Sequence, residues 1–212
     1  MRTQHRRILS CLAFAILLMF AGSAGAETLA ICGQGWLEKT DGQMVLHLKG
    51  TPYEMGYQHG ALLKDHCREN MTYLLHEKGK ELLKIGPLQV SPRLIINGIV
   101  DVQRKHIPQK YFDELAGLAA GADLPIGDIL AGNFIPEMFH CSGFAVMNSA
   151  TADGTLYHGR VLDYACDWRL QEHAVLIIAE PDGAIPFVNV SYAGFVGSVT
   201  GMNLQQVSIG EM

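Results

Sequence analysis

Residues 140–163 read HCSGFAVMNSATADGTLYHGRVLD, and the sequence changes from a helical to a strand-like pattern at this point. Residues 142–148 are rich in small and apolar side chains, and residues 156–162 form a second segment of this kind. Asp153 and Gly154 lie between them, and Asp-Gly favours a tight turn because both residues tolerate positive φ. The pattern predicts a β-hairpin that begins directly after Cys141.

The return strand of this hairpin carries Arg160 and Asp163. A hairpin brings the end of its second strand back beside the start of the first, so both side chains are expected near Cys141. A cysteine is a weak nucleophile until it becomes a thiolate, which a neighbouring guanidinium favours. If the chain is cut before Cys141, the new α-amine has a pKa of about 7.7 to 8, which suits a general base. Cys141 would then supply both the nucleophile and the base, with a carboxylate to orient the amine.

Upstream of this hairpin the apolar spacing predicts mainly helices. Thr51, Pro52 and Glu54 form a helix start, in which Thr51 and Glu54 cap each other's backbone N–H groups. The helix is expected over residues 52–83, with room for a break near Lys78-Gly79 and an end at Gly86-Pro87. Further elements are predicted as a short strand at 44–48 and helices at 92–105, 109–120 and 124–131.

Downstream, a second hairpin is expected from strands at 174–179 and 185–192 around the turn Pro181-Asp182-Gly183. Two more strands are expected at 195–200 and 206–209, around a turn at Gly201-Met202-Asn203. Short strands joined by tight turns predict an antiparallel sheet. Helices followed by strands predict the α+β class.

The chain resembles the choloylglycine hydrolase and penicillin acyltransferase branch of the Ntn hydrolases, and more closely its C45-type autoproteolytic acyltransferase/hydrolase group. Residues 50–60, GTPYEMGYQHG, are similar to the pro-segment motif of that group. Cys141, the Asp-Gly turn and residues 159–163, GRVLD, are similar to its nucleophile hairpin, where G-R-N-x-D is usual. Residues 201–203, GMN, with residues 207–210, VSIG, resemble a later strand. Two departures are His140, where the family often has Gly, and Val161, where Asn is common.

The resemblance implies an Ntn-hydrolase αββα sandwich, of which this chain holds a part. It implies that the Cys141 thiol attacks the His140 carbonyl, and that an N-to-S shift and hydrolysis then separate the two residues. Residues 27–140 become a mainly helical α chain, and residues 141–212 begin the catalytic β chain. Cys141, Arg160 and Asp163 are the implied catalytic residues: Asp163 holds the new α-amine and Arg160 polarises the site. The oxyanion side chain and outer helices of the family are expected beyond Met212, as for a C-terminally truncated chain.

Simpler interpretations of these residues stand beside the catalytic one. In an exported protein Cys141 could pair with Cys166, and Cys32 with Cys67. Arg160 and Asp163 could form an ordinary surface ion pair. An exposed part-sheet would also leave open edges and uncovered apolar faces.

Other polar and aromatic residues receive structural interpretations. Tyr53, Tyr57 and His59 are interpreted as packing residues of their helix, and Asn203 as a turn residue. No cofactor and no metal are expected, because the spacing of His59 and His140 from the cysteines fits no zinc pattern. A papain-like cysteine–histidine pair is disfavoured, since only His158 and His173 follow Cys141.

The first 26 residues have the pattern of a signal peptide. Basic residues near the N-terminus precede an apolar run at 11–20, and Ala24-Gly25-Ala26 forms a small-x-small cleavage site. The protein is therefore predicted to be secreted or periplasmic, with an uncleaved N-terminal anchor as the alternative. The net charge of −5 without a basic stripe disfavours a nucleic-acid partner.

Together these patterns predict a secreted, self-cleaving cysteine hydrolase or acyltransferase. It would act on a linear amide or thioester bond of a small acylated amine or amide, through an acyl-enzyme on Cys141. The alternative is a catalytically silent binding or scaffold fragment that keeps the family sequence.

Overall fold

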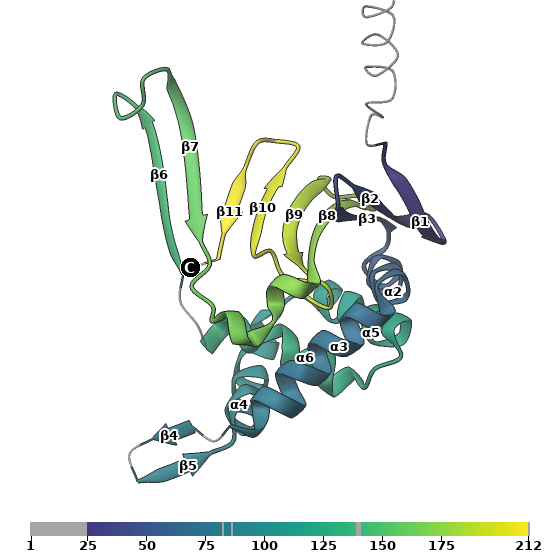
Figure 1. Ribbon diagram of the computed structural model, residues 1–212, viewed down its shortest axis with the longest axis vertical. Coiled ribbons are helices and arrows are strands. Elements are labelled where there is room, and N and C mark those ends of the chain that lie inside the picture. Colours follow the sequence, from purple (N-terminus) through teal and green to yellow (C-terminus); the bar gives the residue numbers. More distant parts are fainter. Residues whose placement is uncertain (1–24, 82, 86, 139–140, 212) are drawn as a thin grey trace, which may run out of the picture.

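A computed structural model describes residues 25–81, 83–85, 87–138 and 141–211. Most of the predicted signal peptide, and His140 of the predicted cleavage site, lie outside these residues. One seven-stranded sheet carries a layer of helices on one face, and a separate hairpin stands beside its far edge (Figure 1). The described part contains no helix long and apolar enough to cross a membrane.

Three strands precede the first helix: β1 (Glu27–Cys32), β2 (Gly35–Thr40) and β3 (Gln43–Gly50). Tight turns join them, with positive φ at Gly33, Asp41 and Gly42. Only the middle of β3 was predicted from the sequence. β1 is the edge strand of the sheet and is exposed along most of its length, so its sequence shows no strong apolar alternation. β2 lies between β1 and β3, and its six residues were too short a signal for the prediction.

The N-terminal and C-terminal halves of the chain share one sheet. Its strand order is β1-β2-β3-β8-β9-β10-β11, and β3 runs parallel to β8 (Ala174–Pro181) with Leu46 opposite Ile177. The remaining pairs are antiparallel, so the sheet is mostly antiparallel, as predicted for the strands after Cys141. The parallel pair of β3 with β8 was not predicted from the sequence. The α+β class is consistent with this arrangement.

The first helix begins as predicted. Thr51 Oγ1 accepts the Glu54 N–H at 3.3 Å, the Glu54 carboxylate accepts the Thr51 N–H at 2.8 Å, and α2 (Pro52–Leu62) follows. It ends at Leu63 rather than continuing to residue 83. α3 (Lys64–Thr72), a π-helical turn (Tyr73–Glu77) and a 3₁₀ turn (Lys78–Lys80) follow in its place, then a hairpin of β4 (Leu83–Ile85) and β5 (Leu88–Val90).

The other helices match the predicted ones closely. They are α4 (Pro92–Gln103), α5 (Gln109–Ala122) and α6 (Ile126–Asn133), with short 3₁₀ turns at Arg104–His106 and Ile135–Met138. α2 packs on α5 so closely that glycines are required at the crossing. A Cβ on Gly56 would lie 1.9 Å from the carbonyl oxygen of Glu114, and one on Gly117 would lie 2.1 Å from that of Tyr53.

After Cys141 the two predicted hairpins are present. β6 (Ser142–Asn148) pairs with β7 (Gly154–Val161), and β8 pairs with β9 (Phe187–Tyr192). Short 3₁₀ turns (Cys166–Trp168 and Leu170–His173) link them.

Of the last two strands predicted from the sequence, the one at 206–209 overlaps β11 and the one at 195–200 was misplaced. The predicted strand at 195–200 is a turn and loop, and the predicted turn at 201–203 is itself β10 (Thr200–Asn203). β10 pairs with β11 (Ser208–Gly210), and Asn203 Oδ1 accepts the N–H groups of Gln205 and Val207 in the turn between them. Asn203 is therefore the last residue of a strand rather than a turn residue, and its side chain stabilises the turn that follows.

The helices cover one face of the sheet, and apolar side chains stay exposed elsewhere. The core lies between helices and sheet, around Leu46, Leu118 and Ile129, which are fully buried. Exposed large apolar residues gather on the β6–β7 hairpin and on β9 to β11, and include Phe144, Leu156, Val161, Val190, Met202 and Ile209. The uncovered apolar surface expected from the sequence is thus present. Within the described residues there is one helical layer and one large sheet, which is compatible with part of the expected sandwich.

Candidate active site

The β6–β7 hairpin brings Arg160 back to the start of β6. Residues 142 to 144 pair in register with residues 161 to 159, so Arg160 lies opposite Gly143, next to Cys141. Gly154 has a φ of +74° at the tip, and Asp153 Oδ1 accepts the Thr155 N–H at 3.0 Å. The Asp-Gly turn predicted from the sequence therefore sets the register that aligns these residues.

Cys141 and Arg160 are in direct contact. Arg160 Nη2 lies 3.1 Å from Cys141 Sγ, and the guanidinium side chain is only 6% exposed. A buried guanidinium loses the screening that water gives, so it stabilises a neighbouring thiolate more strongly than a surface arginine does.

Glu211 completes this contact, and the sequence analysis missed it. Its Oε2 lies 2.8 Å from Arg160 Nη2 and 3.7 Å from Cys141 Sγ, and its carbonyl oxygen accepts from Arg160 Nε at 2.8 Å. The two bonds hold the guanidinium plane in one orientation toward the sulfur. A charged residue directly after strand β11 was the available signal, but the contacts between β11 and β7 are tertiary information.

Two further features shape the site around Arg160. Thr200 Oγ1 accepts from Arg160 Nη1 at 3.5 Å, and a Cβ on Gly210 would come within 3.3 Å of Arg160 Cδ. The Arg160 side chain thus passes Gly210 of β11 on its way to the Cys141 sulfur. Figure 1 shows β11 beside the β6–β7 hairpin.

Asp163 contacts Ser142, the residue that follows Cys141 in the chain. Its Oδ2 accepts the Ser142 hydroxyl at 3.1 Å, so the carboxylate contacts the side chain of the first residue of β6. Arg160 and Cys141 are therefore brought together, whereas Asp163 bonds to the neighbour of Cys141. The catalytic roles assigned to the three residues stay predictions.

Two tyrosines border the site. Burial raises the pKa of Tyr164 and of Tyr192, and this effect outweighs the opposing influence of the nearby Arg160 charge. Both phenols thus stay protonated at neutral pH. The flank of the site that they form is partly desolvated and neutral.

The structure also bears on three other interpretations: disulfide pairs, a cysteine–histidine pair and a metal site. All four cysteines of the described part, at positions 32, 67, 141 and 166, are free thiols. His158 bonds Ser208, and His173 faces His66, so these two histidines are engaged away from Cys141. No cluster of three or more metal-binding side chains occurs among the described residues.

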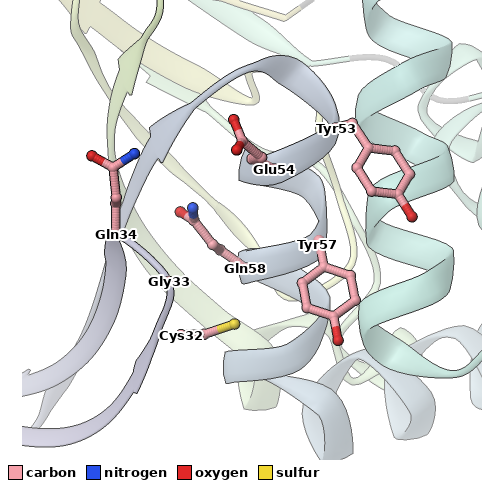
Figure 2. A pocket seen from close by; sticks show the side chains of 7 residues that line it. All are labelled: Cys32, Gly33, Gln34, Tyr53, Glu54, Tyr57 and Gln58. Atoms are coloured by element: carbon pink, nitrogen blue, oxygen red, sulfur yellow. The ribbon is translucent and has the colours of Figure 1, made fainter.

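A hollow of about 380 Å³ lies at the opposite edge of the sheet, between the β1–β2 turn and α2. Figure 2 shows Cys32, Gln34 and Gln58 around it, with Tyr53 and Tyr57 on α2. Its polar side chains serve the fold: Gln58 bonds both the N–H and the C=O of Lys49, and Glu54 caps α2. Tyr53 and Tyr57 are almost half exposed, so their interpretation as packing residues is wrong.

Comparison with known proteins finds homologues at modest identity. The chain is 25% identical over 78% of its length to the acyl-coenzyme A:6-aminopenicillanic-acid-acyltransferase of Emericella nidulans. It is 26% identical over 53% of its length to the N-acylethanolamine-hydrolyzing acid amidase of Caenorhabditis elegans. The chain is a homologue of the C45-family Ntn hydrolases.

The similarity to another relative is more extensive along the chain. An uncharacterized protein of Archaeoglobus fulgidus is 30% identical to this chain over 94% of the chain's length. The chain spans 38% of that protein, 39% of the worm amidase and 46% of the fungal acyltransferase, less than half of each. No family model matches the chain.

Replacing Arg160 with methionine is expected to slow alkylation of Cys141 by about 10-fold or more at neutral pH, because the charge beside the sulfur is lost. The measurement is the iodoacetamide reaction rate at the Cys141 peptide, followed by mass spectrometry. Arg169→Met is the matched control, since that arginine is exposed and paired with Glu172. Equal rates in the parent and in Arg160→Met would show that the guanidinium does not activate the thiol.

His59 is a packing residue of this Ntn homologue, as predicted. It is 1% exposed, and its Nε2 accepts the Gly194 N–H at 3.0 Å. Burial lowers its pKa from 6.5 to about 4. The imidazole is therefore neutral in the folded protein, which suits its role as an acceptor.

Acidification is expected to destabilise the fold through His59. In the unfolded chain the His59 imidazole takes up a proton below pH 6.5, whereas in the folded chain it does so only near pH 4. The stability that this difference contributes is therefore fully present above pH 6.5 and is lost as the pH falls from 6.5 to about 4. The contribution is about 3 kcal/mol. Urea unfolding from neutral to acidic pH should show a shallower loss in His59→Gln, whose side-chain oxygen can accept the same N–H. Parallel losses in both proteins would exclude His59 as the source.

Proposed function

We propose that this chain carries the nucleophile of a self-cleaving amide-bond hydrolase or acyltransferase, with Cys141 as that nucleophile. The single observation that carries the proposal is the 3.1 Å contact between Arg160 Nη2 and Cys141 Sγ, directly before the first strand of a β-hairpin. The homology to an amidase and an acyltransferase supports the reaction class.

The first step is the cleavage of the chain itself. The Cys141 thiol attacks the carbonyl carbon of His140; the C–N bond breaks and a thioester forms, leaving Cys141 with a free α-amine. Water then hydrolyses the thioester, which yields a carboxylate on His140 and restores the thiol. Residues 27–140 and residues 141–212 remain associated through the shared sheet, in which β3 pairs with β8.

The mature site would then act on a small acylated amine or amide. The thiolate attacks the acyl carbonyl, and the departing amine takes its proton from the α-ammonium of Cys141. Water, or a second amine, then takes the acyl group from the sulfur. Arg160 favours the thiolate, Glu211 fixes the arginine, and Asp163, already at the start of β6, orients the α-amine.

The same proposal includes export, because the pattern of the first 26 residues is that of a signal peptide. Cleavage after Ala26 would make Glu27, the first residue of β1, the new N-terminal residue.

The intact mass of the purified protein tests the proposal. Two fragments that separate between His140 and Cys141, with Cys141 labelled by a thiol-reactive amide analogue, are the expected result. A single uncut chain that resists labelling at Cys141 would contradict it. That result would support the alternative of a silent binding or scaffold fragment, which the uncovered apolar surface on β6, β7 and β9 to β11 would suit.

A further inference from the structure

A buried turn lies between the helical layer and the site. Tyr192 O accepts the Phe195 N–H at 3.0 Å, and Gly194 has a φ of +94°, so residues 192–195 form a turn that requires glycine at its third position. Ala193, Gly194 and Phe195 are all buried. Their backbone groups need partners inside the protein, because water does not reach them.

Side chains from three helices supply those partners. His59 of α2 accepts the Gly194 N–H at 3.0 Å, and Asn70 of α3 donates to Ala193 O at 2.8 Å. Asn133, the last residue of α6, donates to Gly194 O at 2.9 Å and accepts the Val196 N–H at 2.8 Å. We call His59, Asn70 and Asn133 the turn clamp.

The chain that leaves this turn reaches the candidate site within a few residues. Val199 O accepts the Glu211 N–H at 3.1 Å, and Thr200 Oγ1 accepts from Arg160 Nη1 at 3.5 Å. Val199 thus contacts the backbone of Glu211, and Thr200 contacts the guanidinium of Arg160 itself. Of the three turn-clamp residues, Asn133 is the one whose hydrogen bond lies nearest to residues 199 and 200, because it accepts the Val196 N–H.

We propose that Asn133 is a positioning residue for Cys141, acting through residues 196–200 on Arg160 and Glu211. The proposal rests on the proposed function, since it assigns Asn133 to the same site. Losing the amide leaves the buried Gly194 O and the Val196 N–H without their partners, and the loop must shift to recover them. A shift of about 1 Å at Arg160 is enough to weaken an oriented charge contact strongly.

The test compares Asn133→Ala with the parent in iodoacetamide labelling of the Cys141 peptide, across a range of pH. The expected result is labelling about threefold or more slower at neutral pH, with the pH profile displaced to higher pH. Cys166 of the same chain is exposed and serves as the internal reference whose rate stays constant. If Asn133→Ala does not fold, Asn133→Asp keeps the acceptor for Val196 and removes the donors to Gly194 O and Ile129 O.

A control separates positioning from general destabilisation. Ile129→Val removes a buried methylene from the same helix, and its labelling profile should match the parent although its melting temperature falls. The proposal is overturned if the Asn133 variants label at the parental rate and pH, or if Ile129→Val displaces the profile equally. Failure of the proposed function is a different result: a parent chain that never cleaves, whatever its labelling profile.

Discussion

The Cys141→Ala variant is expected to remain one uncut chain under conditions in which the parent is completely divided. Alanine has no nucleophile to attack the His140 carbonyl, and peptide hydrolysis by water alone is slow. The loss in cleavage rate should be about 10³-fold or more, as for other enzymes that lose their nucleophile. Intact mass after matched incubation times measures the remaining single chain.

Two companion variants sharpen this result. Cys141→Ser retains a hydroxyl that can attempt the same acyl shift, but it is a weaker nucleophile, so cleavage should be slow rather than absent. Cys166→Ala removes an exposed thiol with no part in the site and should divide like the parent. If Cys141→Ala still splits between residues 140 and 141, an outside protease makes the cut and self-cleavage is refuted.

The second large effect is expected at the crossing of α2 and α5. Gly56→Ala should lower the free energy of unfolding by about 3 kcal/mol, because the new Cβ would lie 1.9 Å from Glu114 O and 2.9 Å from Leu118 N. Both are backbone atoms of a helix, so relief requires the two helices to separate. The melting temperature should fall by roughly 6 to 12 °C.

Gly98→Ala is a matched control, for which the opposite change in the free energy of unfolding is expected. Gly98 also lies within a helix, α4, but a Cβ built there has no atom within 4 Å. Gly98→Ala should therefore raise stability by about 0.5 to 1 kcal/mol, since alanine loses less backbone entropy in a helix. Thermal unfolding of both variants tests the pair. A small effect at Gly56 would mean that the helices do not cross as closely as the structure has them.

Local features of this protein were predictable because their causes are local. The capping of α2 needs only Thr51, Pro52 and Glu54 in sequence, and the β6–β7 hairpin needs only an Asp-Gly turn between two apolar segments. The contact between Arg160 and Cys141 follows from that hairpin's register. Errors arose where local signals were weak, as at Leu63, where α2 ends without glycine or proline, and at residues 201–203, which form a strand despite their turn-like composition.

What the sequence determined by itself was therefore the β6–β7 hairpin, with Cys141 directly before it, Arg160 on its return strand and Asp163 just after that strand. Only the tertiary structure decided how that hairpin is completed. Glu211 lies 70 residues from Cys141, and its place depends on β11 lying beside β7. The parallel pairing of β3 with β8 and the turn clamp likewise join segments far apart in the chain. Such contacts form because packing buries their surfaces and polar groups together, and no short stretch of residues encodes that partnership.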